Sequence, residues 1–212
     1  MRSADPKSIS YERLEPTLRT GDVFLFHGES SVSKGVEKAT RSRFSHAAMV
    51  IRPHLSRRPM LWQTGPKFLV KDQLTLSNHG GAQLGDLHDV LIFMGQPRFG
   101  DTPYCRKLNI KRTPEFEKMA MLIVSDIDGR KFPKMTQMAR QYAAGTKMRS
   151  ESDRTLFCAE LVAETFMRLG VLFLHPPPNA YSPKHFSEQY HSLPLRHGAW
   201  FEPERKVLLP TK

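Results

Sequence analysis

The sequence predicts a single α+β domain, and three observations lead to that prediction. The chain has 212 residues, of which 39% are hydrophobic, so it is long enough to bury one sizeable core and short for two. Short apolar runs bounded by Gly and Pro occupy the first half, whereas apolar residues with helical spacing occupy the second. A block of strands followed by a block of helices is typical of α+β folds rather than of alternating βαβ units.

Apolar runs between turn-forming residues predict where the strands lie. We expect residues 1–19 to be a polar lead-in and residues 20–212 to form the domain. Residues 76–89 are rich in Gly, His and Asn, which indicates a loop. The strands are expected at residues 21–28, 45–51, 60–64 and 90–94, with 68–74 continuing the sheet and 207–209 as a last edge strand.

Capping residues and helical spacing predict the helices. Ser30 or Ser31 is a suitable N-cap for the first helix, and Pro114 suits the start of the second. Prolines at 176–178 force an extended connection into a short turn or helix near 182–190. The helices are expected at residues 31–41, 115–125, 135–144 and 157–169.

A large excess of basic residues gives the chain a formal net charge of +11. This excess favours anionic partners, and we expect salt-sensitive peripheral binding to anionic membranes. Nucleic acid is a weaker candidate, because aromatic residues do not interleave with the basic ones. A basic surface without any partner is the other interpretation, since the charge is scattered along the chain. The basic clusters are Arg52, Arg57 and Arg58, and Arg106, Lys107, Lys111 and Arg112.

The sequence shows no segment for secretion or membrane insertion. The first ten residues lack an apolar core, and no apolar run approaches the roughly 20 residues that cross a bilayer. Two cysteines are too few for a disulfide framework. We therefore expect a cytoplasmic protein with free thiols, which meets a membrane only at its surface. The oligomeric state is left open.

Common metal and nucleotide motifs do not occur in the sequence. The nine histidines form no HExxH, no CxxC is present, and there is no Gly-rich phosphate loop. Four histidines in a Pro-rich segment are expected at the surface; they are His175, His185, His191 and His197. We therefore expect no metal or organic cofactor, and nucleotide hydrolysis is not expected.

Cys158 and His46 are candidate catalytic residues. Cys158 falls in the first turn of a predicted amphipathic helix, where unpaired N–H groups and the helix dipole stabilise a thiolate and can hold an oxyanion. His46 lies in a predicted strand beside Ala47 and Ala48, which are small enough for close approach. A thiol nucleophile needs an imidazole within reach, oriented by a third polar group. Gln63, on the next predicted strand, is the natural candidate for that group.

Each of these residues also has a plainer interpretation. A free Cys is among the most buried residue types, and a lone His in a strand is more often structural than catalytic. The second thiol, Cys105, lies in a predicted basic loop that would lower its pKa. Because no histidine motif accompanies Cys105, Cys158 is the preferred nucleophile.

Three motifs, taken in their order along the chain, resemble a known superfamily. GDVFLF at residues 21–26, SHAAMVI at 45–51 and FCAELV at 157–162 are similar to motifs of permuted papain-like proteins of the NlpC type. That group includes YiiX-like proteins, a poxvirus branch and, more distantly, the lecithin retinol acyltransferase group. In its members the histidine strand precedes the cysteine helix, as it does here. The resemblance covers roughly residues 20–190.

The resemblance implies a small antiparallel sheet, curved toward a barrel, with the cysteine helix packed on it. It implies Cys158 as nucleophile, His46 as base, and Gln63 at the position where the family has a third polar residue, often Glu or His. A neutral amide orients the imidazole but stabilises its protonated form less than a carboxylate would. Asp22 matches the GD strand of the family, where we interpret it as structural.

The implied function is cysteine-dependent hydrolysis or acyl transfer at an amide or ester bond, through an acyl-thioester intermediate. The substrate would be a peptide or a lipid acyl group. A non-catalytic module that keeps the papain-like groove, and binds lipid or another anionic partner, is the alternative. For the enzyme we expect about 3–4 Å between the Cys158 sulfur and a His46 ring nitrogen. We also expect Gln63 at the far ring nitrogen, and a thiol pKa lowered to between ~3.5 and ~7.5.

Overall fold

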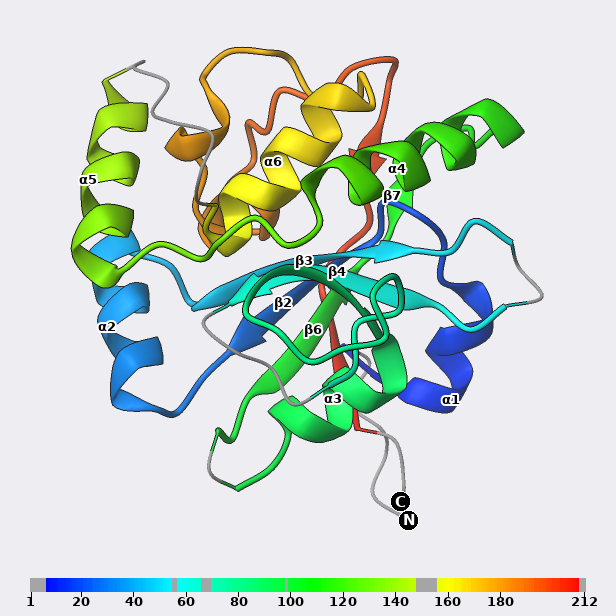
Figure 1. The fold of residues 1–212 in the computed structure, drawn as a ribbon, viewed down its shortest axis with the longest axis horizontal. Helices are drawn as coiled ribbons and strands as arrows, with labels where there is room; N and C mark the ends of the chain where they lie inside the picture. The colour runs from blue at the N-terminus through cyan, green and yellow to red at the C-terminus, as the bar shows by residue number, and fades with distance from the viewer. Residues whose placement is uncertain (1–6, 55–56, 66–69, 98, 148–155, 210–212) are drawn as a thin grey trace.

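Seven strands form one mixed sheet in the computed structural model (Figure 1). The structure describes residues 7–54, 57–65, 70–97, 99–147 and 156–209. The strand order is β1-β9-β6-β2-β3-β4-β5, and all neighbours are antiparallel except the parallel pair β1 and β9. The strands are β1 (Ser8–Ser10), β2 (Val23–His27), β3 (His46–Ile51), β4 (Met60–Gly65), β5 (Gly81–Asp86), β6 (Thr102–Arg106) and β9 (Arg205–Leu208), with β7 (Leu108–Asn109) and β8 (Trp200–Phe201) forming a separate pair.

Helices cover both faces of this sheet, so the α+β class is as expected, whereas the sheet is mixed rather than purely antiparallel. Figure 1 shows α4 and α6 over one face and α1 and α3 over the other. The helix that begins with Cys158, α6, packs on β3 and β4. The helices are α1 (Tyr11–Leu14), α2 (Ser31–Thr40), α3 (Leu87–Met94), α4 (Pro114–Ile127), α5 (Met135–Thr146) and α6 (Cys158–Arg168), with short 3-10 turns η1 (Glu15–Thr17), η2 (Pro178–Ala180) and η3 (Pro183–Phe186).

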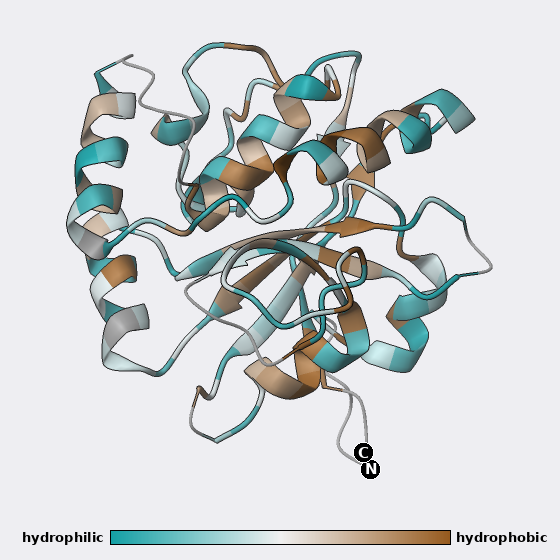
Figure 2. Ribbon diagram, in the orientation of Figure 1, coloured by the Kyte–Doolittle hydropathy of each residue, from teal (hydrophilic) through white to brown (hydrophobic). Residues whose placement is uncertain are grey.

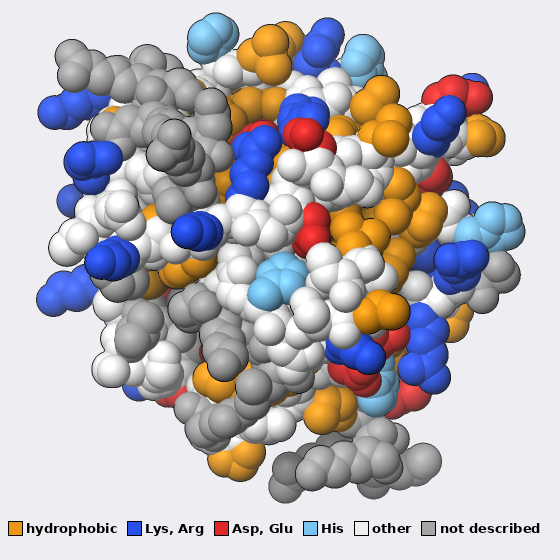
Figure 3. All heavy atoms as spheres, viewed as in Figure 1, with side chains coloured by type: hydrophobic (Ala, Val, Ile, Leu, Met, Phe, Trp, Pro, Cys, Tyr) orange, Lys and Arg blue, Asp and Glu red, His pale blue; other side chains and the backbone are white. Residues whose placement is uncertain are grey.

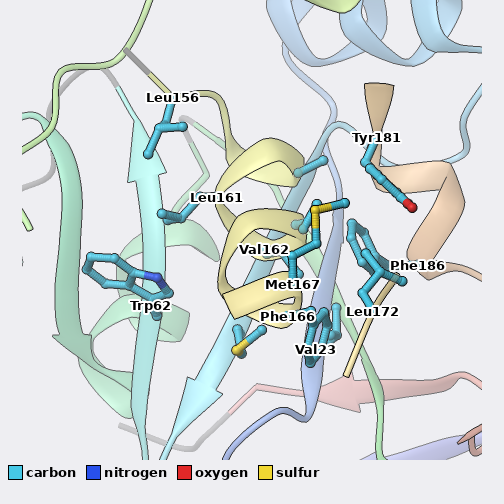
Figure 4. Packing of buried hydrophobic residues seen from close by; sticks show 14 of the residues in the cluster. Val23, Trp62, Leu156, Leu161, Val162, Phe166, Met167, Leu172, Tyr181 and Phe186 are labelled. Carbon is cyan, nitrogen blue, oxygen red and sulfur yellow. The ribbon is translucent and has the colours of Figure 1, made fainter. Parts of the chain in front are cut away.

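Strand side chains alternate between two apolar clusters, one on each face of the sheet. On the α6 side, Trp62 lies close to Leu161 and Phe166 (Figure 4), and its indole N–H donates a hydrogen bond to a threonine of α6 at 3.1 Å. All residues of α6 except Glu164 and Arg168 are buried. Because each large apolar side chain contributes about 1.5–3 kcal/mol when buried, this packing holds the first turn of α6 firmly against the sheet.

The four helices expected from capping and spacing are confirmed. The Ser30 hydroxyl accepts a hydrogen bond from the Ser33 N–H at 3.1 Å at the start of α2, which identifies Ser30 as the N-cap. At the start of α4, Thr113 accepts from Phe116 N–H at 3.2 Å, with Pro114 at the first helical position.

Two expectations for residues 76–94 are wrong. The predicted loop contains β5, a strand of small and polar residues that lacks the alternating pattern. The predicted strand at residues 90–94 is the end of α3, whose N-cap Asp86 accepts a hydrogen bond from Asp89 N–H at 3.3 Å. A short apolar run does not distinguish a buried helix from a buried strand, and Figure 2 shows most of α3 in the hydrophobic colours. Residues 68–74 were expected to continue the sheet. Of these, residues 68–69 lie outside the described residues, and the rest make one isolated β-bridge, between Asp72 and Gly85.

The ends of the chain contribute more to the sheet than the sequence indicates. Residues 8–17, expected as lead-in, form β1, α1 and η1, and Tyr11 and Leu14 are buried. The expected edge strand at 207–209 corresponds to β9, which is not an edge: it pairs with β1 on one side and β6 on the other. Cys105, expected in a loop, lies within β6.

Three members of the predicted basic clusters are used inside the protein. Arg52 donates to the carbonyls of Glu15 and Leu18 at 2.7 and 3.3 Å. Arg106 and Arg112 likewise donate to backbone carbonyls. In the view of Figure 3 the remaining Lys and Arg side chains are spread over the face, with acidic side chains among them.

Candidate active site

The first turn of α6 carries Cys158, the first residue of that helix. The helix begins there because the Glu160 carboxylate accepts a hydrogen bond from Phe157 N–H at 3.2 Å, which caps the first turn. The thiol is only 7% exposed. Backbone N–H groups of Ala47, Ala159 and Cys158 itself interact with the sulfur and favour its ionised form. The sequence thus predicts correctly that the thiol lies among N–H groups at a helix start.

The pairing between β3 and β4 stops two residue pairs before it would reach Ala47. It runs from Ile51↔Met60 to Met49↔Trp62 and is not continued toward His46, the first residue of β3. The N–H of Ala47 is therefore available for the Cys158 sulfur rather than for a strand partner. This places the thiol beside the backbone of the residue that follows His46.

His46 and Gln63 are in contact on neighbouring strands, as the sequence predicts. The His46 Nε2 atom lies 3.2 Å from Gln63 Oε1, so the ring carries its proton on Nε2 when it donates to this amide oxygen. The ring also packs against Phe26, with 5.5 Å between ring centroids, on the sheet face opposite the α6 cluster. The other ring nitrogen, Nδ1, is then left as the basic atom for the thiol proton.

The structure brings Cys158 next to the His46 backbone but does not join the two side chains. Among the described residues, the His46 ring hydrogen-bonds to Gln63 and not to Cys158. The expected sulfur-to-nitrogen distance of about 3–4 Å therefore stays a prediction. Cys158 belongs to α6, which covers one face of the sheet, whereas the His46 ring contacts Phe26, a member of the cluster on the other face.

Burial determines the ionisation states of Cys158 and His46, and it disagrees with the expectation that Cys158 is a thiolate. Burial raises the pKa of Cys158 to about 11, against the smaller lowering by its N–H neighbours. Burial also lowers the pKa of His46 to about 4, and the hydrogen bond that the ring donates to Gln63 opposes this only partly. The prediction of a lowered thiol pKa is wrong because it considers the N–H groups and dipole at the helix start but not the desolvation of the sulfur, which has the larger effect. At neutral pH the Cys158 side chain is therefore a thiol and the His46 side chain a neutral imidazole.

Sequence reasoning missed Gln83, the residue of β5 that is paired with Gln63. Gln83 is fully buried, and its Nε2 donates to the carbonyl of His79 at 3.2 Å. Within the described residues, Gln63 Nε2 and Gln83 Oε1 have no hydrogen-bond partner, and the two residues lie opposite each other in the β4–β5 pairing. No local signal marks Gln83, because the strand that carries it was predicted as a loop.

The second thiol is placed deep in the other cluster. Cys105 is 2% exposed, and its strand neighbours are Phe24 and Arg205. Burial raises the pKa of Cys105 well above its ordinary value. Asp22 is structural, as expected: its carboxylate accepts from Arg19 N–H and Leu108 N–H, both at 2.9 Å.

Fold and site together define an α+β protein with a buried cysteine at a helix N-terminus and a His–Gln pair on adjacent strands. A scan against known protein families and a search of curated proteins find no match. Among solved structures, the chain is similar to metalloprotein yiiX from Escherichia coli O157:H7, DUF1105, with 17% sequence identity and a TM-score of 0.49. The similarity covers 91% of this chain and 89% of that one. Within the described residues, each helix is too short or too polar to span a membrane.

Proposed function

We propose that this protein is a cysteine-dependent hydrolase or acyltransferase that acts on an amide or ester bond. The observation that carries the proposal is the position of the Cys158 sulfur, at the first turn of α6 and beside the N–H of Ala47. An imidazole held by Gln63 belongs to the preceding residue, His46. A nucleophile, a base and hydrogen-bond donors for an oxyanion therefore meet within one small region.

The first half of the reaction forms an acyl-thioester. His46 Nδ1 takes the thiol proton as the sulfur attacks the substrate carbonyl, so that a C–S bond forms and the carbonyl electrons move onto oxygen. N–H groups at the start of α6 and of Ala47 stabilise that oxyanion. When the oxyanion collapses, the C–N or C–O bond breaks and the leaving group takes the proton from the imidazolium.

The second half releases the acyl group. Water, or an acceptor alcohol or amine, loses a proton to His46 and attacks the thioester, and the thiol is restored as the C–S bond breaks. Because the resting ring is bonded to Gln63 on the other sheet face, it must turn toward the sulfur in the first step. Gln63 is the positioning residue: its amide oxygen fixes which ring nitrogen carries the proton.

Peptides and lipid acyl groups remain the proposed substrate classes, with an anionic membrane surface as the proposed partner. The net charge of +11 supports the membrane partner. A second candidate is a binding module without catalysis. The observation that favours it is the burial of both groups, which keeps the thiol protonated and leaves the sulfur 7% exposed.

An acylating active-site probe should separate the two candidates. An electrophilic acyl ester probe is expected to label the protein at one site, and Cys158→Ala should abolish that labelling, because this thiol lies at a helix start among N–H groups that can hold the oxyanion. Intact-mass spectrometry gives the stoichiometry, and peptide mapping gives the residue.

Cys105→Ala is the matched control, since it removes the other buried thiol and should leave labelling unchanged. The binding-module candidate predicts instead that neither thiol is acylated while the protein is folded. Acylation of Cys105 in preference to Cys158 would reverse the assignment of the nucleophile.

The Gln63→Glu variant should raise the pKa of His46. A carboxylate in place of the amide stabilises the imidazolium, and an opposite charge at this range shifts a pKa by roughly 1–3 units. The folded-state pKa of His46 is about 4. We therefore expect an upward shift from that value, measured by NMR titration of the ring protons, and a matching upward shift of the acid limb of any pH–rate profile.

Gln73→Glu is the control variant. Gln73 is exposed, so this substitution adds the same negative charge at a position away from the His46 ring. An unchanged His46 pKa in Gln63→Glu would show that Gln63 does not hold the ring in solution.

A further inference from the structure

Three segments of the chain meet along the outer edge of β5. The Asp72 carboxylate accepts a hydrogen bond from Leu84 N–H at 2.8 Å, which attaches its loop to the strand. The segment after α4 attaches beside it, since Ala82 N–H donates to the Arg130 carbonyl at 2.8 Å. At Gly81, φ is +99° and an added Cβ would lie 2.3 Å from that carbonyl, so only Gly permits this approach.

The convergence brings together two carboxylates and one imidazole. One ligand atom each from Asp72, His79 and Asp128 lies within 4.8 Å of both others. The distance from His79 Nε2 to Asp72 Oδ1 is 3.9 Å, too long for a hydrogen bond. The three residues come from three separate segments, the Asp72 loop, the approach to β5 and the end of α4.

The orientation of His79 directs a lone pair into this cluster. Its Nδ1 lies 3.1 Å from the Gly80 carbonyl oxygen, which can only accept, so Nδ1 carries a proton. In a neutral ring Nε2 is then the unprotonated atom. A neighbouring carbonyl or carboxylate that fixes the far nitrogen in this way is the usual support of a metal-binding histidine.

Two polar atoms of these side chains are buried and lack a hydrogen-bond partner among the described residues. Neither His79 Nε2 nor Asp128 Oδ1 has a hydrogen bond within the described part of the chain, and each is shielded from solvent. Leaving a buried polar atom unsatisfied is destabilising. A cation would satisfy both atoms at once.

We propose that Asp72, His79 and Asp128 bind one divalent transition-metal cation, of which Zn²⁺ is the best match. One imidazole nitrogen and two carboxylate oxygens are typical zinc ligands, with bonds of about 2.0–2.2 Å. Two carboxylates balance the charge of a dication. The three atoms must draw closer together than the 4.8 Å that now bounds their separations to reach that coordination.

The Asp72 carboxylate is already held in place for this role. Its Oδ1 accepts from Leu74 N–H and Thr75 N–H at 2.9 and 2.7 Å. The Thr75 hydroxyl also lies 3.0 Å from Oδ1, but it has a second partner in the Ser77 hydroxyl at 2.9 Å. The other oxygen, Oδ2, accepts from Leu84 N–H at 2.8 Å, and its second lone pair is the one that the cation would use.

The site is separate from the proposed reaction, which has no step there. It is connected to the His46–Gln63 pair only through Gln83, whose amide donates to the His79 carbonyl. The cation would tie the Asp72 loop and the end of α4 to the edge of β5. Its role is therefore structural.

A second cluster provides the matched control. Asp86, His88 and Asp89 also offer ligand atoms within 4.8 Å of one another, but they are partly or fully exposed. Here the imidazole already has a partner, since His88 Nδ1 lies 3.4 Å from Asp89 Oδ1. His88→Gln therefore removes an imidazole that also lies near two aspartates, and it leaves the proposed site unchanged.

The test is a calorimetric titration with Zn²⁺ after chelator treatment and dialysis. All proteins carry Cys105→Ala and Cys158→Ala, so that no thiol binds the metal. We expect one equivalent to bind, and the melting temperature to rise with Zn²⁺. His79→Gln and, separately, Asp128→Asn should weaken binding by more than about 100-fold, since losing even an outer-shell partner costs about 10–100-fold. His88→Gln should bind as the parent does.

Three results would overturn the proposal. The parent protein could bind no zinc, His79→Gln and Asp128→Asn could bind it unchanged, or His88→Gln could lose it. The first result, with NMR showing protons on both nitrogens of His79, would mean that an imidazolium balances the two carboxylates. Circular dichroism of the metal-free variants separates loss of the site from loss of the fold.

Discussion

Alkylation of Cys158 by iodoacetamide should become about tenfold faster with each unit of pH between about 6 and 10. The thiolate is the reactive form, and burial raises the pKa of this thiol to about 11. Well below that pKa the thiolate fraction grows tenfold per pH unit, so the rate should change by roughly four orders of magnitude over this range. The measurement is the pseudo-first-order rate of carbamidomethylation, followed by mass spectrometry.

The Cys158 peptide from protein unfolded in denaturant is the reference, and its rate should level off near an ordinary thiol pKa of about 8.5. Cys105 should react more slowly than Cys158 throughout, because it is more deeply buried. A rate that is constant between about pH 5 and 8 would contradict the prediction. It would show that a thiolate–imidazolium pair forms in solution, with the sulfur more solvated than the structure has it.

Arg112→Met should destabilise the protein by about 3–5 kcal/mol, the usual loss when one member of a buried ion pair is removed. The Arg112 guanidinium lies 3.1 Å from the Asp22 carboxylate. It also donates to the carbonyls of Thr20, Ile110 and Leu108, so four acceptors lose a donor. Urea denaturation followed by fluorescence or circular dichroism measures the free energy of unfolding.

The loss should be larger at pH 8 than at pH 5. Burial raises the pKa of Asp22 to about 6 even with Arg112 beside it, and removing Arg112 raises that pKa further. A carboxyl whose pKa is higher in the folded than in the unfolded protein adds to the free energy of unfolding while it is protonated, and this contribution is lost as pH rises through the folded-state pKa. At pH 8 the unpaired Asp22 carboxylate of the variant is therefore costly, whereas at pH 5 the carboxyl is protonated with or without Arg112. Lys111→Met is the control, since Lys111 is exposed, and should change stability by less than about 0.5 kcal/mol.

Elements with local signals could be predicted from the sequence. Helices α2 and α4 have capping side chains that their neighbours in sequence specify. The contact between His46 and Gln63 was predictable because β3 and β4 follow each other and pair as neighbours. Local sequence determines both kinds of feature.

Features that depend on distant segments could not be predicted. The partners of Ser8 and Ile9 are Lys206 and Val207, and no local pattern connects them. The ionisation of Cys158 depends on how much protein surrounds the sulfur, which the helix sequence does not contain. The internal use of Arg52 likewise depends on carbonyls contributed by a segment that the sequence indicated to be a lead-in.

The parallel pairing of β1 with β9 has a consequence for how the protein is made. Residues 8–10 pair with residues 206–208, and β9 is also the strand that connects β1 to β6. During synthesis the first strand therefore emerges long before its partner. At about 5–20 residues per second, the interval is on the order of 10–40 s. Throughout that time β1 lacks its partner strand, and β6 lacks one on the same side from about halfway through it, so the nascent chain exposes both edges to the chaperones that meet it.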